Sequence, residues 1–203
     1  MHRLIFATHN QGKVKEMRAL MERLGLEILS ADEAGVHEDP TEDGATFEEN
    51  ALKKARFIVE QTGEWAVADD SGIMIDALDG RPGVHTARWA GENAGDEGLI
   101  RHALEELKGV EERRRGASFH SVVALVSPGG EAWAFEGVLS GRITVLPRGT
   151  PRPKLPYDLI FQPSGSDRTF AEMSDEEKNA MSHRGQAFQK LKTFLSSQRV
   201  VHS

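Results

Sequence analysis

The sequence predicts an α/β protein, and two patterns along its 203 residues support that prediction. In the first half, short apolar runs alternate with segments whose apolar residues recur at helical spacing, which is typical of strands followed by amphipathic helices. From residue 116 to about residue 150, β-branched and aromatic residues dominate between turn residues, which indicates an antiparallel ribbon. We therefore expect a single domain over residues 1–203, with a boundary between two lobes at roughly residues 116–150.

The bulk composition describes an ordinary chain that can bury a core, with 38% hydrophobic and 28% charged residues. A formal charge of −7 argues against a general polyanion binder, so we expect no nucleic-acid partner. Cysteine is absent, which excludes disulfides and thiolate chemistry. No apolar run approaches about 18 residues, and the first apolar stretch is too short for a signal peptide. We expect a cytoplasmic protein with no membrane partner.

The first unit along the chain is an apolar strand at residues 4–7, a polar turn, and an amphipathic helix that ends at Gly25. The turn consists of Thr8, His9, Asn10, Gln11, Gly12 and Lys13. Backbone N–H groups and the positive end of a helix dipole favour an anion at such a turn, and Lys13 adds a full charge. The spacing is not that of a Walker A loop. The alternative is an ordinary βα turn with a solvated lysine.

A second strand at residues 26–29 leads to an acidic, Pro- and Gly-punctuated loop at residues 38–44. The loop is either solvated surface, the default for a charge run, or it brings a carboxylate to a metal. The next helix opens with Thr46 and Glu49 in the pattern of a capping box. Along this helix, Asn50 and Lys54 stand one turn apart and therefore share a face.

Two adjacent carboxylates, Asp69 and Asp70, follow the apolar run at residues 65–68. We interpret that run as a buried strand, and Ser71 and Gly72 as its exit turn. Because two neighbouring anions repel each other and are costly to bury, a divalent cation would relieve them. The alternative is an acidic turn or an N-cap, where Asp and Ser are common in any case.

The second half of the chain contains a predicted helix at residues 99–107 and a ribbon that turns at residues 128–130. Three prolines within residues 148–156 exclude regular secondary structure there. Ser174 and Glu177 form a second capping-box pattern at the start of a short helix. We expect a last helix at about residues 186–196.

Seven short motifs, in a fixed order over nearly the whole chain, together resemble the inosine/xanthosine triphosphate pyrophosphatase family. They lie at residues 7–13, 46–51 with Lys54, 68–72, 81–84, 157–158, 170–172 with 177–178, and 182–184. The resemblance implies an elongated, twisted mixed sheet flanked by helices, with two lobes around a central cleft, and a homodimer. It also implies Mg²⁺ as cofactor. The substrates it implies are the non-standard purine nucleoside triphosphates ITP, dITP and XTP, cut between the α and β phosphates.

The resemblance assigns roles to individual residues. Asp70 is the general base and a metal ligand, and Glu42 is a second metal ligand. The family often shows a Glu-Glu pair where this chain has Thr41-Glu42-Asp43, and the role of Asp69 stays open. The substrate-binding residues that the resemblance implies are Thr8, His9, Asn10, Gln11, Gly12, Lys13, Lys54, Ser71, Leu155, Pro156, Tyr157, Asp158, Lys178, His183 and Arg184.

The chain departs from the family pattern at residues 150–158, which are two residues longer than expected. Leu155 stands where an aromatic residue is expected to pack on the base, and such stacking is worth roughly 1–3 kcal/mol. Tyr157 is a candidate substitute, and Arg152 or Lys154 are candidates for phosphate or base contacts. One alternative is therefore a pyrophosphatase with altered base preference. A second alternative, a non-catalytic nucleotide-binding module, conflicts with the presence of Asp70, Lys13 and Lys54.

Overall fold

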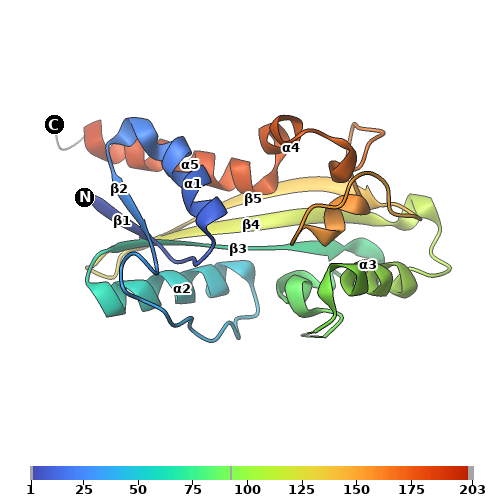
Figure 1. Cartoon of the computed structure of the whole chain (residues 1–203), viewed down its shortest axis with the longest axis horizontal. Helices are drawn as coiled ribbons and strands as arrows, with labels where there is room; N and C mark the ends of the chain where they lie inside the picture. Colours follow the sequence, from blue (N-terminus) through green and yellow to red (C-terminus); the bar gives the residue numbers. More distant parts are fainter. Residues whose placement is uncertain (1, 92, 201–203) are drawn as a thin grey trace. The chain divides into compact units, whose positions relative to one another are not determined.

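A computed structural model of the chain describes residues 2–91 and 93–200 (Figure 1). The strands are β1 (Arg3–Phe6), β2 (Glu27–Ser30), β3 (Trp65–Ile75), β4 (Gly116–Val126), β5 (Ala132–Ile143) and β6 (Phe161–Pro163). The α-helices are α1 (Gln11–Met21), α2 (Phe47–Thr62), α3 (Gly95–Glu106), α4 (Asp175–Met181) and α5 (His183–Val200). Short 3₁₀ turns include η3 (Gly83–Arg88), η5 (Pro156–Leu159) and η6 (Phe170–Glu172).

The strands form one mixed sheet in the order β2-β1-β3-β4-β5-β6. β1 runs parallel to both β2 and β3, whereas β5 and β6 are antiparallel. This confirms the predicted α/β class with a mixed sheet. Within the described residues, no helix combines the length and the apolar character that crossing a bilayer requires.

Contacts divide the described chain into two compact units. The first unit holds the residues up to Asp70, Ser121–Gly137 and the segment from Gln186 onward. The second unit holds Ser71–His120 and Val138–Gly185. Residues 116–150 therefore contribute to both units. The single domain over residues 1–203 and the lobe boundary within it stay predictions.

The core of the first unit lies between its strands and two helices on one face, α1 and α5, while α2 covers the other face (Figure 1). Alternate strand residues such as Leu4 and Phe6 point to the α1/α5 side, because successive side chains of a strand face opposite ways. Phe6 meets Phe188 of α5 edge to face, with ring centroids 5.7 Å apart. Complete burial of a large apolar side chain stabilises the folded state by roughly 1.5–3 kcal/mol.

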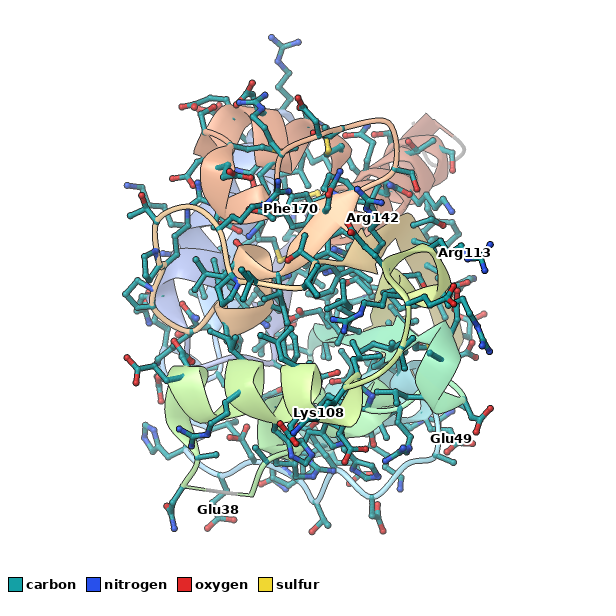
Figure 2. All side chains as sticks on the ribbon, turned by 90° about the vertical axis from the view of Figure 1, so that its right-hand side faces the viewer. Glu38, Glu49, Lys108, Arg113, Arg142 and Phe170 are labelled. Atoms are coloured by element: carbon teal, nitrogen blue, oxygen red, sulfur yellow. The ribbon has the colours of Figure 1, made fainter. Side chains whose placement is uncertain are left out.

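The second unit has its own core, built around the rings of Phe119, Phe161 and Phe170. The apolar face of α3 packs against this core through residues such as Leu99 and Leu107. Figure 2 shows Phe170 among packed side chains, while Arg113 points outward. The segments that follow β5 therefore pack on this aromatic core.

Two local predictions need correction. The expected exit turn at Ser71 and Gly72 is wrong, because both residues lie inside β3. The strand continues through the acidic pair because β4 flanks it in the sheet and supplies the neighbouring backbone. Asp69 and Asp70 are therefore consecutive strand residues whose side chains point to opposite faces of the sheet. The last helix starts at His183, three residues before the predicted start at Gln186.

The cap at the start of α2 is confirmed in part. The Thr46 hydroxyl accepts a hydrogen bond from the Glu49 amide at 3.1 Å, as the capping pattern predicts. The Glu49 carboxylate instead accepts from the Ala45 amide at 2.7 Å. The α4 capping box is confirmed in full, with Ser174 and Glu177 bonding each other's backbone amides.

Candidate active site

The predicted polar turn joins β1 to the start of α1. Asn10 is the N-cap, and its side-chain oxygen accepts hydrogen bonds from the amides of Gly12 at 2.9 Å and Lys13 at 3.3 Å. Thr8 holds the turn from the other side, since its hydroxyl accepts from the Asn10 amide at 3.2 Å. The first turn of α1 carries no acidic side chain. The strand, turn and helix start are thus arranged as an anion-binding site requires.

Lys13 reaches from this turn to the acidic pair on β3. Its ammonium donates to both carboxylate oxygens of Asp69, each at 2.9 Å. Asp69 is buried, so the ion pair holds the Lys13 side chain in one direction rather than leaving it solvated. The sequence left the role of Asp69 open. In the structure, Asp69 positions Lys13 through this contact.

Asp70 belongs to a second cluster, built on α2 and the acidic loop. The Lys54 ammonium lies 3.2 Å from an Asp70 oxygen and 3.5 Å from an oxygen of Glu42. The Asn50 amide group donates to the other Asp70 oxygen at 3.3 Å. Because Asn50 and Lys54 are one turn apart on α2, the helix presents both to the same carboxylate.

The ionisable groups in this cluster shift one another's pKa values. Burial raises the pKa of the Asp70 carboxyl and Glu42 raises it further, while Lys54 and the Asn50 hydrogen bond act in the opposite direction. Burial lowers the pKa of Lys54, but the carboxylates of Asp70, Glu42 and Asp69 outweigh that effect and raise it overall. Lys54 therefore stays cationic. The ionised form of Asp70 is less favourable than that of an exposed aspartate, and added positive charge would favour it.

Asn50 also ties down the loop that carries Glu42. Its side-chain oxygen accepts a hydrogen bond from the Gly44 amide at 2.8 Å, and the residue is 0% exposed. A Cβ at Gly44 would come within 2.5 Å of that oxygen, so the close approach depends on glycine. The helical spacing predicts that Asn50 lies beside Lys54, but it indicates no function for Asn50. The available signal was an amide on the otherwise apolar inner face of α2.

The fit of a metal ion can be judged from these donors. Among residues 2–91 and 93–200, no group of three or more His, Cys, Asp or Glu is arranged to hold a metal. Mg²⁺ does not need such a group, because it usually takes one or two protein carboxylates and completes its octahedron with water and phosphate oxygens. Glu42 and Asp70, which share Lys54, supply two carboxylates. The donor set therefore fits Mg²⁺ that arrives with a phosphorylated substrate.

A separate cluster in the second unit surrounds Asp158, which lies in η5. Its side chain is 4% exposed and contacts the ammonium of Lys178 and, at 3.5 Å, the guanidinium of Arg152. Lys178 also lies 5.2 Å above the centre of the Phe170 ring, in a cation–π arrangement. The capping box of α4 positions Lys178 one turn into that helix.

The remaining predicted residues of this unit are placed as follows. His183 stacks on Phe119, with ring centroids 4.8 Å apart and planes 8° from parallel, and Arg184 follows it at the start of α5. Leu155 is half-buried and Pro156 is buried at the start of η5. Ser71, half-buried, begins the part of β3 that belongs to this unit.

Tyr157 is a core residue. Its hydroxyl donates to the Thr86 carbonyl at 3.1 Å, and its ring packs in the aromatic core. Burial raises the pKa of the Tyr157 phenol well above its ordinary value. These contacts argue against Tyr157 as a substitute for the missing stacking residue at Leu155.

His9, within the polar turn, faces two carboxylates. Its Nδ1 lies 2.8 Å from Asp32, and its Nε2 lies 3.3 Å from Asp39. The hydrogen bond to Asp32, followed by the charge of Asp39, raises the pKa of His9 despite partial burial. Asp32 also contacts His37 at 3.3 Å. The two carboxylates therefore favour the protonated form of this imidazole.

Comparisons with known proteins bear on the whole chain. The family model described as Ham1 family matches residues 4–194. A dITP/XTP pyrophosphatase of Geobacter sulfurreducens is 46% identical over 200 residues, which cover 98% of this chain and 100% of the relative. A dITP/XTP pyrophosphatase of Bacillus subtilis is 43% identical, covering 97% of this chain and 98% of the relative.

Solved structures agree with these relatives. A HAM1 protein from Coxiella burnetii matches with a TM-score of 0.91 and 41% identity, covering 97% of this chain and 100% of that one. The Staphylococcus aureus Ham1 protein matches with a TM-score of 0.90 and 34% identity, covering 97% of this chain and 99% of that one. Since the family model, the relatives and the folds agree over nearly the full length, the chain belongs to the Ham1 family.

Proposed function

We propose that this chain is a Mg²⁺-dependent pyrophosphatase that hydrolyses ITP, dITP and XTP to the nucleoside monophosphate and pyrophosphate. The observation that carries the proposal is the placement of Asp70 and Glu42 on one lysine, Lys54. The same unit holds the anion-binding turn and Lys13. The names of the relatives, dITP/XTP pyrophosphatases, supply the substrate class.

The first unit supplies the groups that triphosphate chemistry needs. A triphosphate brings about four negative charges, which must be neutralised before a nucleophile can approach. The α1 start, Lys13 and Lys54 bind phosphate oxygens, and Glu42 and Asp70 would hold Mg²⁺. The bound ion would neutralise charge and lower the pKa of Asp70.

Asp70, once ionised, takes a proton from the attacking water. The new P–O bond forms from that water, and the anhydride bond between the α and β phosphates breaks. Pyrophosphate leaves with the bonding electrons. Asn50 holds one Asp70 oxygen, so the other oxygen keeps a fixed direction.

The second unit supplies donors for a 6-oxo purine. Lys178, His183 and Arg184 are donor-rich, and a carbonyl at position 6 of the base accepts from such groups. An adenine amino group would leave them unpaired, which is a strong form of rejection. The half-buried Leu155 offers apolar contact where an aromatic stack is expected. This difference favours a test of base preference rather than of phosphate chemistry.

We further propose, from the resemblance, that the protein is a cytoplasmic homodimer with a single pyrophosphatase domain. We propose neither a nucleic-acid nor a membrane partner. Light scattering of the purified chain at several concentrations tests the dimer. A mass of one chain at all concentrations would contradict it.

Pyrophosphate release from a panel of ITP, dITP, XTP, GTP, ATP and CTP tests the activity. We expect turnover of the first three with Mg²⁺ and none after chelation. Hydrolysis of ATP or CTP as fast as ITP would favour the alternative of altered base preference. If no triphosphate is cleaved with Mg²⁺ present, the chain is a nucleotide-binding module instead.

The Asp70→Asn variant tests the base. We expect kcat to fall about 10²–10⁴-fold, as loss of a general base does. The melting temperature should change little, because Asn keeps the shape of Asp70 and Lys54 keeps the Glu42 carboxylate as a partner at 3.5 Å. Asp43→Asn, on an exposed carboxylate next to Glu42 in the acidic loop, is the matched control. Near-wild-type turnover of Asp70→Asn would remove Asp70 from this role.

A further inference from the structure

We propose that Arg152 is a positioning residue for base recognition, through its hold on Asp158 and on the turn beneath Lys178. Arg152 lies in the segment where the chain departs from its family, and no recognised motif includes it. The inference rests on the proposed function, because it concerns how that same enzyme selects its base.

The guanidinium of Arg152 joins three parts of the second unit. Nη1 donates to the Phe170 carbonyl at 3.0 Å, and Nη2 donates to the Met173 carbonyl. The same group lies 3.5 Å from Asp158 and, through Nε, 3.3 Å from Asp175 at the start of α4. A planar fork with five fixed donors can serve these acceptors together, whereas an ammonium cannot.

These contacts extend a backbone seam between residues 149–152 and 170–173. The Thr150 amide donates to the Ala171 carbonyl at 3.1 Å. Gly149, at φ +91°, lies so close that a Cβ would come within 2.4 Å of the Ala171 carbonyl carbon. Since prolines exclude regular structure here, the seam and the Arg152 side chain give this segment its shape. The segment leads directly into Leu155 and Asp158.

Arg152 also changes what Lys178 can do. An ammonium has three donors, and here one faces Asp158 while the Phe170 ring lies on another side. Because Arg152 also pairs with the buried Asp158 carboxylate, Lys178 keeps a fixed position. Lys178 then still has an N–H donor for a base carbonyl. Without Arg152, Asp158 relies on Lys178 alone, and the seam loses its side-chain anchor. Loss of Arg152 should therefore weaken base discrimination more than phosphate chemistry.

Arg152→Met and Arg152→Lys test the proposal. For Arg152→Met we expect the KM for ITP to rise about tenfold while kcat changes less than threefold, so that the ITP:ATP ratio of kcat/KM falls about tenfold. Arg152→Lys keeps the charge but not the fork, and should lie between wild type and Arg152→Met. It also serves as the informative variant if Arg152→Met does not fold. Arg113→Met, on an exposed, outward-pointing arginine, is the matched control and should match wild type (Figure 2).

Calorimetry with IMP and AMP separates this inference from the activity. We expect the wild type to prefer IMP and Arg152→Met to lose about tenfold of that preference. If the wild type cleaves no triphosphate but shows this pattern, the proposed activity fails and the inference stands. If Arg152→Met only lowers the melting temperature and keeps both the IMP:AMP and ITP:ATP ratios, Arg152 is merely structural and the inference is overturned. A wild type that does not distinguish IMP from AMP overturns it as well.

If the wild type prefers IMP to AMP, a double-variant cycle with Asp158→Asn tests whether Arg152 acts through Asp158. If Arg152 acts through Asp158, Arg152→Met should change the IMP:AMP ratio much less in the Asp158→Asn background than in the wild type. Equal effects in both backgrounds would show that Arg152 does not act through Asp158, which overturns the stated route.

Discussion

The two units of the chain carry ion clusters of opposite balance. In the first unit, the contacts join three carboxylates, Asp69, Asp70 and Glu42, to two ammonium groups, Lys13 and Lys54. When all five are ionised, the set carries one net negative charge. Burial raises the pKa of Asp70, and Glu42 adds to this effect against the opposing effect of Lys54.

In the second unit, one carboxylate, Asp158, is contacted by two cations, Lys178 and Arg152. These three groups carry one net positive charge when all are ionised, and Arg152 also contacts the exposed carboxylate of Asp175 at 3.3 Å. In the proposed function, a metal ion would complete the acidic set, whereas a neutral or anionic acceptor such as a base carbonyl would complete the cationic set. The same kind of contact, a buried lysine on an aspartate, would then serve two kinds of chemistry.

The largest effect is expected when each of the two lysines is replaced, in separate variants, by methionine. Lys54 and Lys178 each have side chains that are 12% exposed, so they form a matched pair. Breaking a buried ion pair by removing one partner costs about 3–5 kcal/mol. Lys54→Met leaves two neighbouring carboxylates and should melt lower, yet regain part of the loss when Mg²⁺ is added. Lys178→Met leaves Arg152 paired with Asp158, so this variant should lose less stability. Its melting temperature should not change when Mg²⁺ is added.

The control for this pair is Lys53→Met, on the same helix as Lys54. Lys53 contacts the exposed carboxylate of Asp43, and exposed pairs contribute little to stability. Thermal melts with and without Mg²⁺ give the measurement. Equal responses of Lys54→Met and Lys178→Met to Mg²⁺ would show that the two clusters do not differ in the way described.

A smaller effect is expected from Asn50, which holds the acidic cluster together. Asn50→Ala leaves the Gly44 amide without its acceptor, which costs about 1–3 kcal/mol, and frees the loop that carries Glu42. We expect the Mg²⁺ concentration for half-maximal activity to rise about tenfold. Asn50→Leu fills the volume but not the hydrogen bonds, so it should share the Mg²⁺ defect. A wild-type Mg²⁺ requirement in Asn50→Leu would assign the Asn50→Ala effect to the cavity alone.

Local sequence predicted the parts of the site that local forces build. The turn before α1 was recognisable because a polar stretch with Gly12 and Lys13 stands between an apolar run and an amphipathic helix. In the structure, Asn10 caps that helix. The pairing of Lys13 with Asp69 joins residues 56 apart, and no local pattern encodes it. The wrong prediction of an exit turn at Ser71 has the same origin. Because β3 is paired with the neighbouring strand β4, it extends past the two carboxylates.

In the second unit, sequence reasoning identified Asp158 and Lys178 only through the family resemblance. Arg152 lay in a proline-rich segment without period, so its four partners at residues 158–175 were not predictable. Tyr157 was named as a candidate for the stacking role, because a tyrosine next to a turn gives no sign of which way its ring packs. Its burial against α3 and η3 is decided by the tertiary fold.

The smallest effect is expected from a change of pH, because His9 adds a cation to the acidic unit only when it is protonated. Its raised pKa means that the protonated pair with Asp32 and Asp39 stabilises the fold below the ordinary value near 6.5, and that this contribution is lost as pH rises through the folded-state pKa. His9→Gln should therefore melt about 1–2 °C below wild type at pH 5.5 and level with it at pH 8.5. His37→Gln is the control, since its more exposed ring contacts Asp32 at 3.3 Å and should change the melt less. A His9→Gln deficit that grows toward pH 8.5 would contradict the sign of the pKa shift and leave the acidic unit without this pH-dependent cation.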